Sequence, residues 1–198
     1  MGRLIAVVGA SGVGKTSLVQ ALTKTGSFVV AYEKHAERPF QALFKQDARY
    51  ALANQLDYLL FRAEQEKDLR ASPGIGLVDG GLDLDFHGFT RLFCARGLLS
   101  DPEFDLCRRF YELFRQYLPQ PELIIYLTAG ESLIRHRLAS RERINIASAE
   151  DTLLFNSFLE EWLRTISPLK LLKLDVSAES LVYEKSVSLI MAQIRTLF

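Results

Sequence analysis

Cysteine is scarce in this chain, and its scarcity excludes a small fold held together by disulfide bridges. The 198 residues contain only two cysteines, Cys94 and Cys107, which lie among apolar and helix-forming neighbours without the spacing of metal ligands. We interpret both as buried thiols. The sequence also shows no secretory cleavage pattern, so we expect a reducing, cytoplasmic location.

The chain also lacks an excess of either charge and any long apolar run. Its 24 Lys+Arg are balanced by 24 Asp+Glu, so there is no general attraction to nucleic acid or to an anionic membrane. The first apolar stretch ends at Gly9, far short of the ~18 apolar residues that cross a bilayer. We therefore expect no nucleic-acid or membrane partner, and any bound anion must be held by a local cluster of charge.

What the sequence does contain is an alternation of short apolar runs and segments with helical spacing. The runs are too continuous for a sheet with one wet face, so they predict buried parallel strands at residues 4–8, 28–31, 75–78, 123–127 and 171–176. The helical spacing covers residues 18–22, about 41–69, 104–118 and 153–163. This order predicts an α/β fold, and the length predicts one domain over residues 1–198.

The turn after the first predicted strand carries a phosphate-binding pattern. Residues 9–16 read Gly-Ala-Ser-Gly-Val-Gly-Lys-Thr, which fits G-x-x-x-x-G-K-[ST] between a strand and a helix. In this pattern backbone N–H groups converge on phosphate oxygens, Lys15 reaches the β- and γ-phosphates, and the Thr16 hydroxyl holds Mg²⁺. The predicted nucleotide-binding residues are Gly9, Ser11, Gly12, Val13, Gly14, Lys15, Thr16 and Ser17.

Two acidic residues follow other predicted strands and are expected at the same sheet edge. Asp79 ends the third apolar run, where phosphate-loop proteins place a carboxylate near the metal; a turn residue before Gly80 is the alternative. Glu33 follows the second run. It is either a general base that takes the proton of an attacking hydroxyl or an ordinary surface glutamate.

The predicted long helix carries two polar residues on its apolar side. Gln55 and Arg62 are seven residues apart, so their side chains project from one helix face about 10 Å apart. An amide and a guanidinium on an apolar wall suit the recognition of a flat polar group such as a nucleobase. Alternatively, Gln55 forms a hydrogen bond with a neighbouring loop.

Positive charge gathers after the fourth predicted strand. Arg135, Arg137, Arg141 and Arg143 fall within nine residues of an otherwise neutral chain. In a phosphate-transfer protein such a segment, here about residues 135–150, forms a lid whose guanidiniums stabilise charge in the transition state. A solvated helix face is the alternative.

Taken in this order, the motifs resemble the deoxynucleoside kinase family of P-loop kinases over nearly the whole chain. The resemblance implies a three-layer α/β fold with helices on both faces of a five-stranded parallel sheet in the order 2-3-1-4-5, an Arg-rich lid, and ATP and Mg²⁺ as cofactors. It implies Glu33 as the catalytic base, Gln55 as the reader of the Watson–Crick edge, and an Arg62–Asp85 pair beneath the base. It further implies that the loop at residues 176–179 covers the adenine of ATP, and that the protein forms a homodimer through helices.

The chain departs from the family pattern at three places. Gly80 replaces the arginine that follows the acid after the third strand, and the lid arginines or Arg91 are candidates to replace its charge. The aromatic residue after the catalytic glutamate is absent, with Arg38 near its place. Phe44 stands where a sugar-contacting tyrosine is expected.

The sequence therefore predicts an ATP-dependent kinase for the 5′-hydroxyl of a nucleoside, with purine or deoxycytidine preferred over thymidine. In this hypothesis Lys15 and Glu33 act with Arg137, Arg141 and Arg143 in catalysis, and Thr16 and Asp79 hold the metal. The first alternative is a nucleoside monophosphate or another small molecule as acceptor, with Arg38, Arg49 and Arg62 available for an acceptor phosphate. The second is a P-loop nucleotide-binding module with impaired catalysis, which the loss of arginine at position 80 supports.

Overall fold

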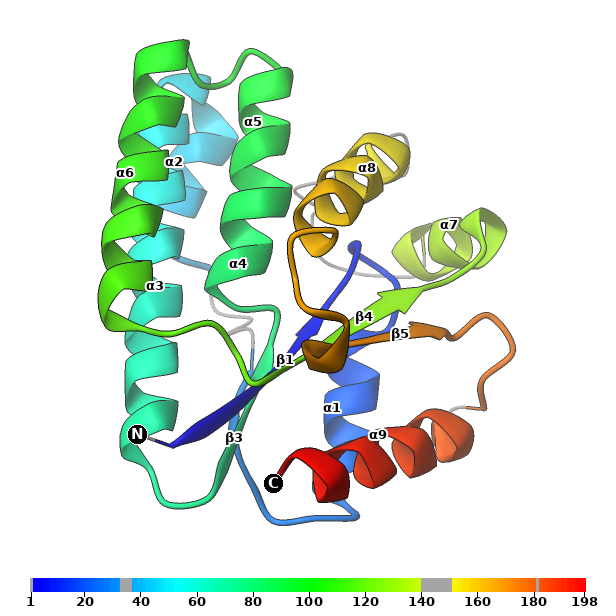
Figure 1. The fold of residues 1–198 in the computed structure, drawn as a ribbon. Coiled ribbons are helices and arrows are strands. Elements are labelled where there is room, and N and C mark those ends of the chain that lie inside the picture. Colours follow the sequence, from blue (N-terminus) through cyan, green and yellow to red (C-terminus); the bar gives the residue numbers. More distant parts are fainter. Residues whose placement is uncertain (1, 33–36, 140–150, 181) are drawn as a thin grey trace.

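The computed structural model describes residues 2–32, 37–139, 151–180 and 182–198. These residues contain one five-stranded sheet with helices on both faces (Figure 1). All strands are parallel, in the order β2-β3-β1-β4-β5, which confirms the predicted sheet. The strands are β1 (Arg3–Val8), β2 (Phe28–Ala31), β3 (Ile75–Asp79), β4 (Leu123–Thr128) and β5 (Leu171–Asp175).

The helices within the described residues fall at every connection between strands. The α-helices are α1 (Lys15–Thr23), α2 (Pro39–Gln46), α3 (Ala51–Ala71), α4 (Leu82–Leu84), α5 (Arg91–Ala95), α6 (Asp101–Tyr117), α7 (Glu131–Ala139), α8 (Thr152–Leu163) and α9 (Glu184–Leu197). A π-helix, η2, covers Asp85–Thr90, and short 3₁₀ turns cover Ala48–Tyr50 (η1) and Pro168–Lys170 (η3). None of the helices in these ranges is long and apolar enough to cross a bilayer.

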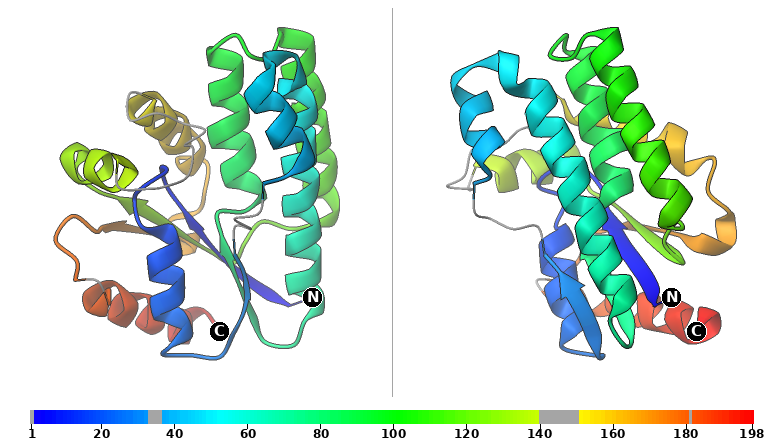
Figure 2. Two further views of the ribbon diagram at one scale, coloured as in Figure 1. Left: turned by 180° about the vertical axis from the view of Figure 1, so that it is seen from behind. Right: turned by 90° about the vertical axis from the view of Figure 1, so that its left-hand side faces the viewer.

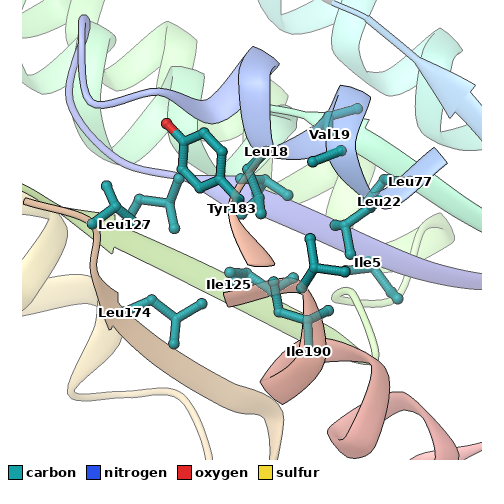
Figure 3. Packing of buried hydrophobic residues seen from close by; sticks show 14 of the residues in the cluster. Ile5, Leu18, Val19, Leu22, Leu77, Ile125, Leu127, Leu174, Tyr183 and Ile190 are labelled. Atoms are coloured by element: carbon teal, nitrogen blue, oxygen red, sulfur yellow. The ribbon is translucent and has the colours of Figure 1, made fainter. Parts of the chain in front are cut away.

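The central strand β1 is apolar from Leu4 onward because both of its faces are covered there. Successive side chains of a strand point to opposite faces, and from Leu4 to Val8 all of them are buried. Ile5 and Val7 join a core under α1 and α9, which Figure 3 shows from close by. Leu4, Ala6 and Val8 join the opposite core, which contains residues of α3 and α8. The continuity of this apolar run is what made the strand predictable.

A further helical layer lies away from the sheet. The two long helices α3 and α6 run side by side (Figures 1 and 2). Between them and α5 lies a third core that contains Leu59 of α3, Phe86 of η2, Phe93 of α5 and Tyr111 of α6. Both thiols are free: Cys107 is fully buried in this core, whereas Cys94 is partly exposed, so the prediction of two buried thiols holds for Cys107 alone.

The prediction of a single helix over residues 41–69 was wrong, because the chain leaves the helical conformation at Asp47. There the backbone is extended, with φ −152° and ψ 122°. The Asp47 carboxylate accepts a hydrogen bond from the Arg49 backbone N–H at 2.9 Å, which starts the next turn. α2 and α3 are therefore separate helices, and α3 alone carries Gln55 and Arg62.

The π-helix η2 lies between α3 and α8. A side chain at Gly88 would place its Cβ 2.4 Å from Cζ of Phe155, so only glycine lets η2 and α8 approach this closely. Wide π turns are frequent at functional sites. Here the π-helix carries Asp85 and Thr90, the partners of Arg62 and Gln55 described below.

His87 is enclosed by polar and aromatic groups of three helices. Its ring stacks on Trp162 of α8 with centroids 5.0 Å apart, and its Nε2 lies 3.1 Å from the Tyr111 hydroxyl. That hydroxyl donates to Oδ1 of Asp83 at 2.7 Å. The pKa of His87 is lowered to about 4, mainly by burial; Asp83 opposes the shift, and the nearby Arg91 and Arg115 contribute to it.

The lowered pKa of His87 predicts a loss of stability in mild acid. Unfolded histidine has a pKa near 6.5, so between pH 6.5 and 4 the unfolded chain binds a proton that the folded chain does not. The free energy of unfolding therefore falls as the pH falls through this window, by about 2 kcal/mol between pH 7 and pH 5. Urea denaturation should show this increment in the wild type and not in His87→Asn.

The exposed His136 of α7 supplies the matched control. His136→Asn should keep the pH dependence of the wild type. If His87→Asn loses as much stability between pH 7 and pH 5 as the wild type does, the assignment of this increment to His87 is wrong.

Candidate active site

The site is built at the edge of the sheet where parallel strands end. β1 runs into residues 9–16, and β3 ends at Asp79, which lies beside Val7 of β1 in the parallel register. The Gly80 N–H donates to the Val7 carbonyl at 2.9 Å, so the two strand ends stay paired up to the turn. β2 ends at Ala31 on the other side of β3. Glu33, the predicted base, lies outside the described residues.

Lys15 is the first residue of α1 and lies against the loop that precedes it. Its Nζ donates to the carbonyls of Gly9 at 3.0 Å and Ala10 at 3.1 Å. The ammonium group is thereby held over the loop whose N–H groups the sequence pattern assigns to phosphate binding. A triphosphate bound there would meet this cation together with the N-terminal end of α1.

Thr16 and Asp79 form the candidate metal site. The Thr16 hydroxyl donates to Oδ2 of Asp79 at 2.5 Å, across the junction between α1 and β3. Asp79 is only 1% exposed, and among the described residues its Oδ1 has no hydrogen-bonding partner. A buried carboxylate oxygen without a partner is costly. Because Mg²⁺ prefers oxygen ligands from a carboxylate, a hydroxyl and phosphates, these residues fit the ion.

Among the arginines that the sequence predicts for a lid, Arg137 lies at the phosphate loop. From α7 its Nη1 donates to the Val13 carbonyl at 2.6 Å. Arg135 lies on another face of the same helix and pairs with Glu131 at 2.7 Å. Arg141 and Arg143 lie outside the described residues, as does most of the predicted lid.

Gln55 and Arg62 are buried on α3 and contact η2, as their common helix face predicts. Gln55 is 3% exposed, and its Oε1 accepts a hydrogen bond from the Thr90 hydroxyl at 3.0 Å. Arg62 pairs with Asp85 at 2.6 Å between Nε and Oδ2. Its Nη1 also donates to the backbone carbonyl of Asp79 at 3.2 Å. One guanidinium thus joins η2 to the segment that carries the candidate metal ligand.

Thr90, which orients the Gln55 amide, was not predicted from the sequence. The Thr90 hydroxyl is fully buried and also contacts the Asp85 carbonyl at 3.0 Å. No local pattern marks this threonine, because its position depends on the π-helix that brings residues 85 and 90 to the same side.

Gly80 leaves no room for the arginine that the family pattern contains. Its φ is +93°, a conformation that side chains rarely adopt, and a Cβ there would lie 3.2 Å from Nη2 of Arg62. Arg91, a candidate replacement, is held against α8: it pairs with Glu161 at 2.7 Å and stacks on Phe158 at 4.4 Å. The Arg91 hydrogen bond lowers the pKa of Glu161.

Arg38 and Phe44, the other two positions that differ from the family pattern, lie where α2 meets α3 and α5. Arg38 pairs with Asp57 at 2.5 Å and covers the Phe61 ring at 4.5 Å. The hydrogen bond with Asp57 raises the pKa of Arg38. Phe44 packs against Phe93 of α5 with ring centroids 5.1 Å apart. Arg38 and Phe44 therefore help to hold α2 in place.

A cavity of about 550 Å³ lies between α1 and α9. Ser17, Gln20 and Lys24 line it from α1, and Val182 and Glu184 line it from the start of α9. The sequence analysis assigned the donor base to residues 176–179, a few residues earlier. There the Ser177 hydroxyl caps the turn by bonding to Asp175 at 2.6 Å.

Known proteins with similar sequences are kinases of deoxynucleosides. The chain is 26% identical over 143 residues to a deoxyadenosine/deoxycytidine kinase of Bacillus subtilis (strain 168), covering 71% of this chain and 66% of that protein. It is 27% identical over 170 residues to a deoxyadenosine kinase of Dictyostelium discoideum, covering 84% of this chain and 69% of that protein. The matches thus span about two thirds of these relatives.

Solved structures give the same fold. The chain is similar to deoxyadenosine kinase from M. mycoides with bound dCTP, with a TM-score of 0.79, 18% identity and coverage of 98% and 99% of the two chains. For the dATP-bound form of that enzyme the TM-score is 0.78 at 19% identity, with coverage of 97% and 99%. The model of the family described as "Deoxynucleoside kinase" matches residues 5–198. Since this match takes in nearly the whole sequence, the chain belongs to the deoxynucleoside kinase family.

Proposed function

We propose that this protein transfers the γ-phosphoryl group of ATP to the 5′-hydroxyl of a deoxynucleoside. The observation that carries the proposal is the position of Arg62, which binds Asp85 on one side and the Asp79 carbonyl on the other. Arg62 therefore connects η2, which carries a residue suited to binding a base, to Asp79, which is suited to holding a metal. Both the named relatives and the family support this reaction.

Each part of the site has a role in this proposal. Lys15 binds the β- and γ-phosphates, and Thr16 and Asp79 hold Mg²⁺, which when bound neutralises charge on the phosphates. Glu33 accepts the proton of the attacking hydroxyl. Arg137, together with Arg141 and Arg143 of a lid at about residues 135–150, stabilises the charge that develops during transfer. The donor's nucleoside extends toward the cavity between α1 and α9.

The pairing of three arginines favours a neutral nucleoside over a nucleoside monophosphate as the phosphate acceptor. A second phosphate would need cations that are not already neutralised. Arg38 pairs with Asp57, Arg49 with Asp47, and Arg62 with Asp85. All three cations that could have served an acceptor phosphate therefore have a carboxylate partner.

The proposal includes a homodimer formed by helices and a single domain over residues 1–198. The outer surfaces of α3 and α6 expose large apolar side chains, with Leu60 at 45%, Leu113 at 49% and Tyr117 at 72%. Apolar side chains clustered on adjacent helices are typical of protein interfaces.

The free thiols Cys94 and Cys107 support a reducing location such as the cytoplasm.

A second candidate function is a nucleotide-binding module with impaired catalysis, which the geometry at Gly80 favours. The missing arginine removes a charge from the phosphoryl-transfer site, and one such charge is worth on the order of 10³-fold in rate. Neither Gly80 nor the paired Arg91 supplies it. Retention of Lys15, Thr16 and Asp79 is consistent with both candidates, so activity decides between them.

The first test is a panel of deoxynucleosides with ATP and Mg²⁺, comparing the wild type with Glu33→Gln. We expect turnover of at least one nucleoside, and a kcat lower by about 10²–10⁴-fold in the variant, because the amide cannot take the proton. ATP binding should be unchanged. Glu37→Gln, at the nearby exposed Glu37 that pairs with Lys45, is the control and should keep wild-type kcat.

No turnover of any nucleoside, with ATP binding retained, would establish the binding module instead. Full activity in Glu33→Gln would remove Glu33 from its role as base.

Base preference follows from the groups beside Gln55. Asp85 accepts hydrogen bonds, so it suits the exocyclic amino groups of adenine and cytosine, whereas thymine presents a carbonyl oxygen and a methyl group. We expect kcat/KM for thymidine to be at least about tenfold below that for the best amino-bearing deoxynucleoside. Competition assays with paired substrates measure this ratio. Thymidine as the best substrate would contradict the assignment.

Metal binding is tested by Asp79→Asn. The amide is a weaker metal ligand than the carboxylate, so we expect kcat/KM to fall by about 10²-fold or more. Thermal-shift measurements with ATP should show extra stabilisation on adding Mg²⁺ in the wild type and none in the variant. Asp101→Asn, at the exposed start of α6, serves as the control. An undiminished Mg²⁺ increment in Asp79→Asn would exclude Asp79 as a metal ligand.

A further inference from the structure

Tyr183 has an unusual backbone conformation directly before α9. Its φ of 55° and ψ of 36° lie in the left-handed region, and among the described residues it is the only non-glycine residue with positive φ. A bulky side chain in this region is strained. Such strain persists only where the surrounding structure holds the residue in place.

The side chain of Tyr183 links the hydrophobic core to the phosphate loop. The residue is 3% exposed and belongs to the core that contains Leu18 and Leu127. Figure 3 shows its hydroxyl pointing out of this cluster, toward the turn between β1 and α1. The ring is thus fixed by packing while the polar end reaches the loop.

The hydroxyl occupies the space beside Gly14. A Cβ built at Gly14 would lie 2.1 Å from the Tyr183 oxygen and 3.2 Å from Nη1 of Arg137. Gly14 also has φ +111°, so both its conformation and its surroundings require glycine. Tyr183 and Arg137 therefore converge on the last glycine of the phosphate loop, immediately before Lys15.

The Tyr183 hydroxyl has no hydrogen-bonding partner within the part of the chain that the structure describes. Arg137, in contrast, donates to the Val13 carbonyl at 2.6 Å. This hydroxyl is not among the buried polar atoms without a partner, so it is open to solvent and to a ligand. A hydroxyl donor beside a loop of N–H groups can bind a ligand that brings an acceptor oxygen. The oxygens of a bound polyphosphate are the acceptors that this loop attracts.

We propose that Tyr183 is a donor-binding residue whose hydroxyl donates a hydrogen bond to a phosphate oxygen of the nucleoside triphosphate held at residues 9–16. This inference rests on the proposed function only in taking a nucleoside triphosphate as the ligand of the loop. The strained backbone fixes the hydroxyl at Gly14 before the ligand arrives, so little conformational entropy is lost on binding.

The test is Tyr183→Phe, which removes the hydroxyl and keeps the ring in the core. Titration calorimetry with Mg²⁺ should show ATP affinity weakened about tenfold, the usual effect of losing a hydrogen bond to a charged group. Affinity for inorganic tripolyphosphate should fall by the same factor, because the contact is with phosphate. The KM for the nucleoside should not change.

Tyr126→Phe is the matched control. The Tyr126 hydroxyl also lacks a partner among the described residues, but it is buried, and the residue belongs to the core on the opposite face of the sheet. This variant should bind ATP and tripolyphosphate like the wild type. Tyr183→Asn, which tolerates the left-handed conformation, provides a second variant without the hydroxyl and should show the same loss of tripolyphosphate affinity.

The outcomes separate this inference from the proposed function. Unchanged affinity for ATP in Tyr183→Phe, or weaker ATP binding with unchanged tripolyphosphate binding, overturns the inference while kinase activity stands. If no nucleoside is phosphorylated but both affinities fall in Tyr183→Phe, the inference holds and the proposed function fails. A wild-type protein that binds neither ligand overturns both.

Discussion

The hydrogen bond between Thr16 and Asp79 is the interaction on which the site depends. It ties the first turn of α1 to the last residue of β3, and these two elements meet only because β1 and β3 are neighbours in the sheet. The Asp79 carbonyl also accepts a hydrogen bond from Arg62, so α3 is tied to the same residue. The carboxylate retains one buried oxygen without a protein partner among the described residues. The folded chain thus holds an unsatisfied group that a bound cation would satisfy, which links stability to ligand binding.

Buried charge on α3 fixes the orientation of this helix. Besides Arg62, the helix buries Glu66 and Arg70. Glu66 binds Arg115 of α6 at 2.8 Å, and Arg70 binds Glu122 before β4 at 3.1 Å. Burial raises the pKa of Glu66, against the opposing charge of Arg115. Breaking a buried pair typically costs 3–5 kcal/mol, so the pairs of Arg62 and Glu66, together with the partly exposed pair of Arg70, leave the helix few alternative positions. Although the chain has no net charge, its opposite charges are paired at specific positions. These pairs fix α3 so that Gln55 contacts η2.

The strands and the phosphate loop could be predicted from the sequence because their signals are local. A buried parallel strand is a continuous apolar run, and residues 9–16 need only their own glycines and the helix that follows. The break at Asp47 was missed because apolar spacing continues across it. The roles of Thr90 and Tyr183 were missed for another reason: each depends on a contact with a residue far away in the sequence, Gln55 and Gly14 respectively. The Arg62–Asp85 pair was expected from a family resemblance and not from spacing, since the π-helix that brings Asp85 into reach has no sequence signature of its own.

The close approach of Phe155 to Gly88 couples the position of α8 to the position of η2. η2 carries the partners of Gln55 and Arg62 on one side and touches α8, which follows the arginine-rich segment, on the other. A substitution on α8 that shifts η2 would alter both partners at once, without touching either. Mutations that adapt this protein to a new base therefore need not lie near the base, and lineages that diverge at position 155 would be expected to diverge at position 88 as well.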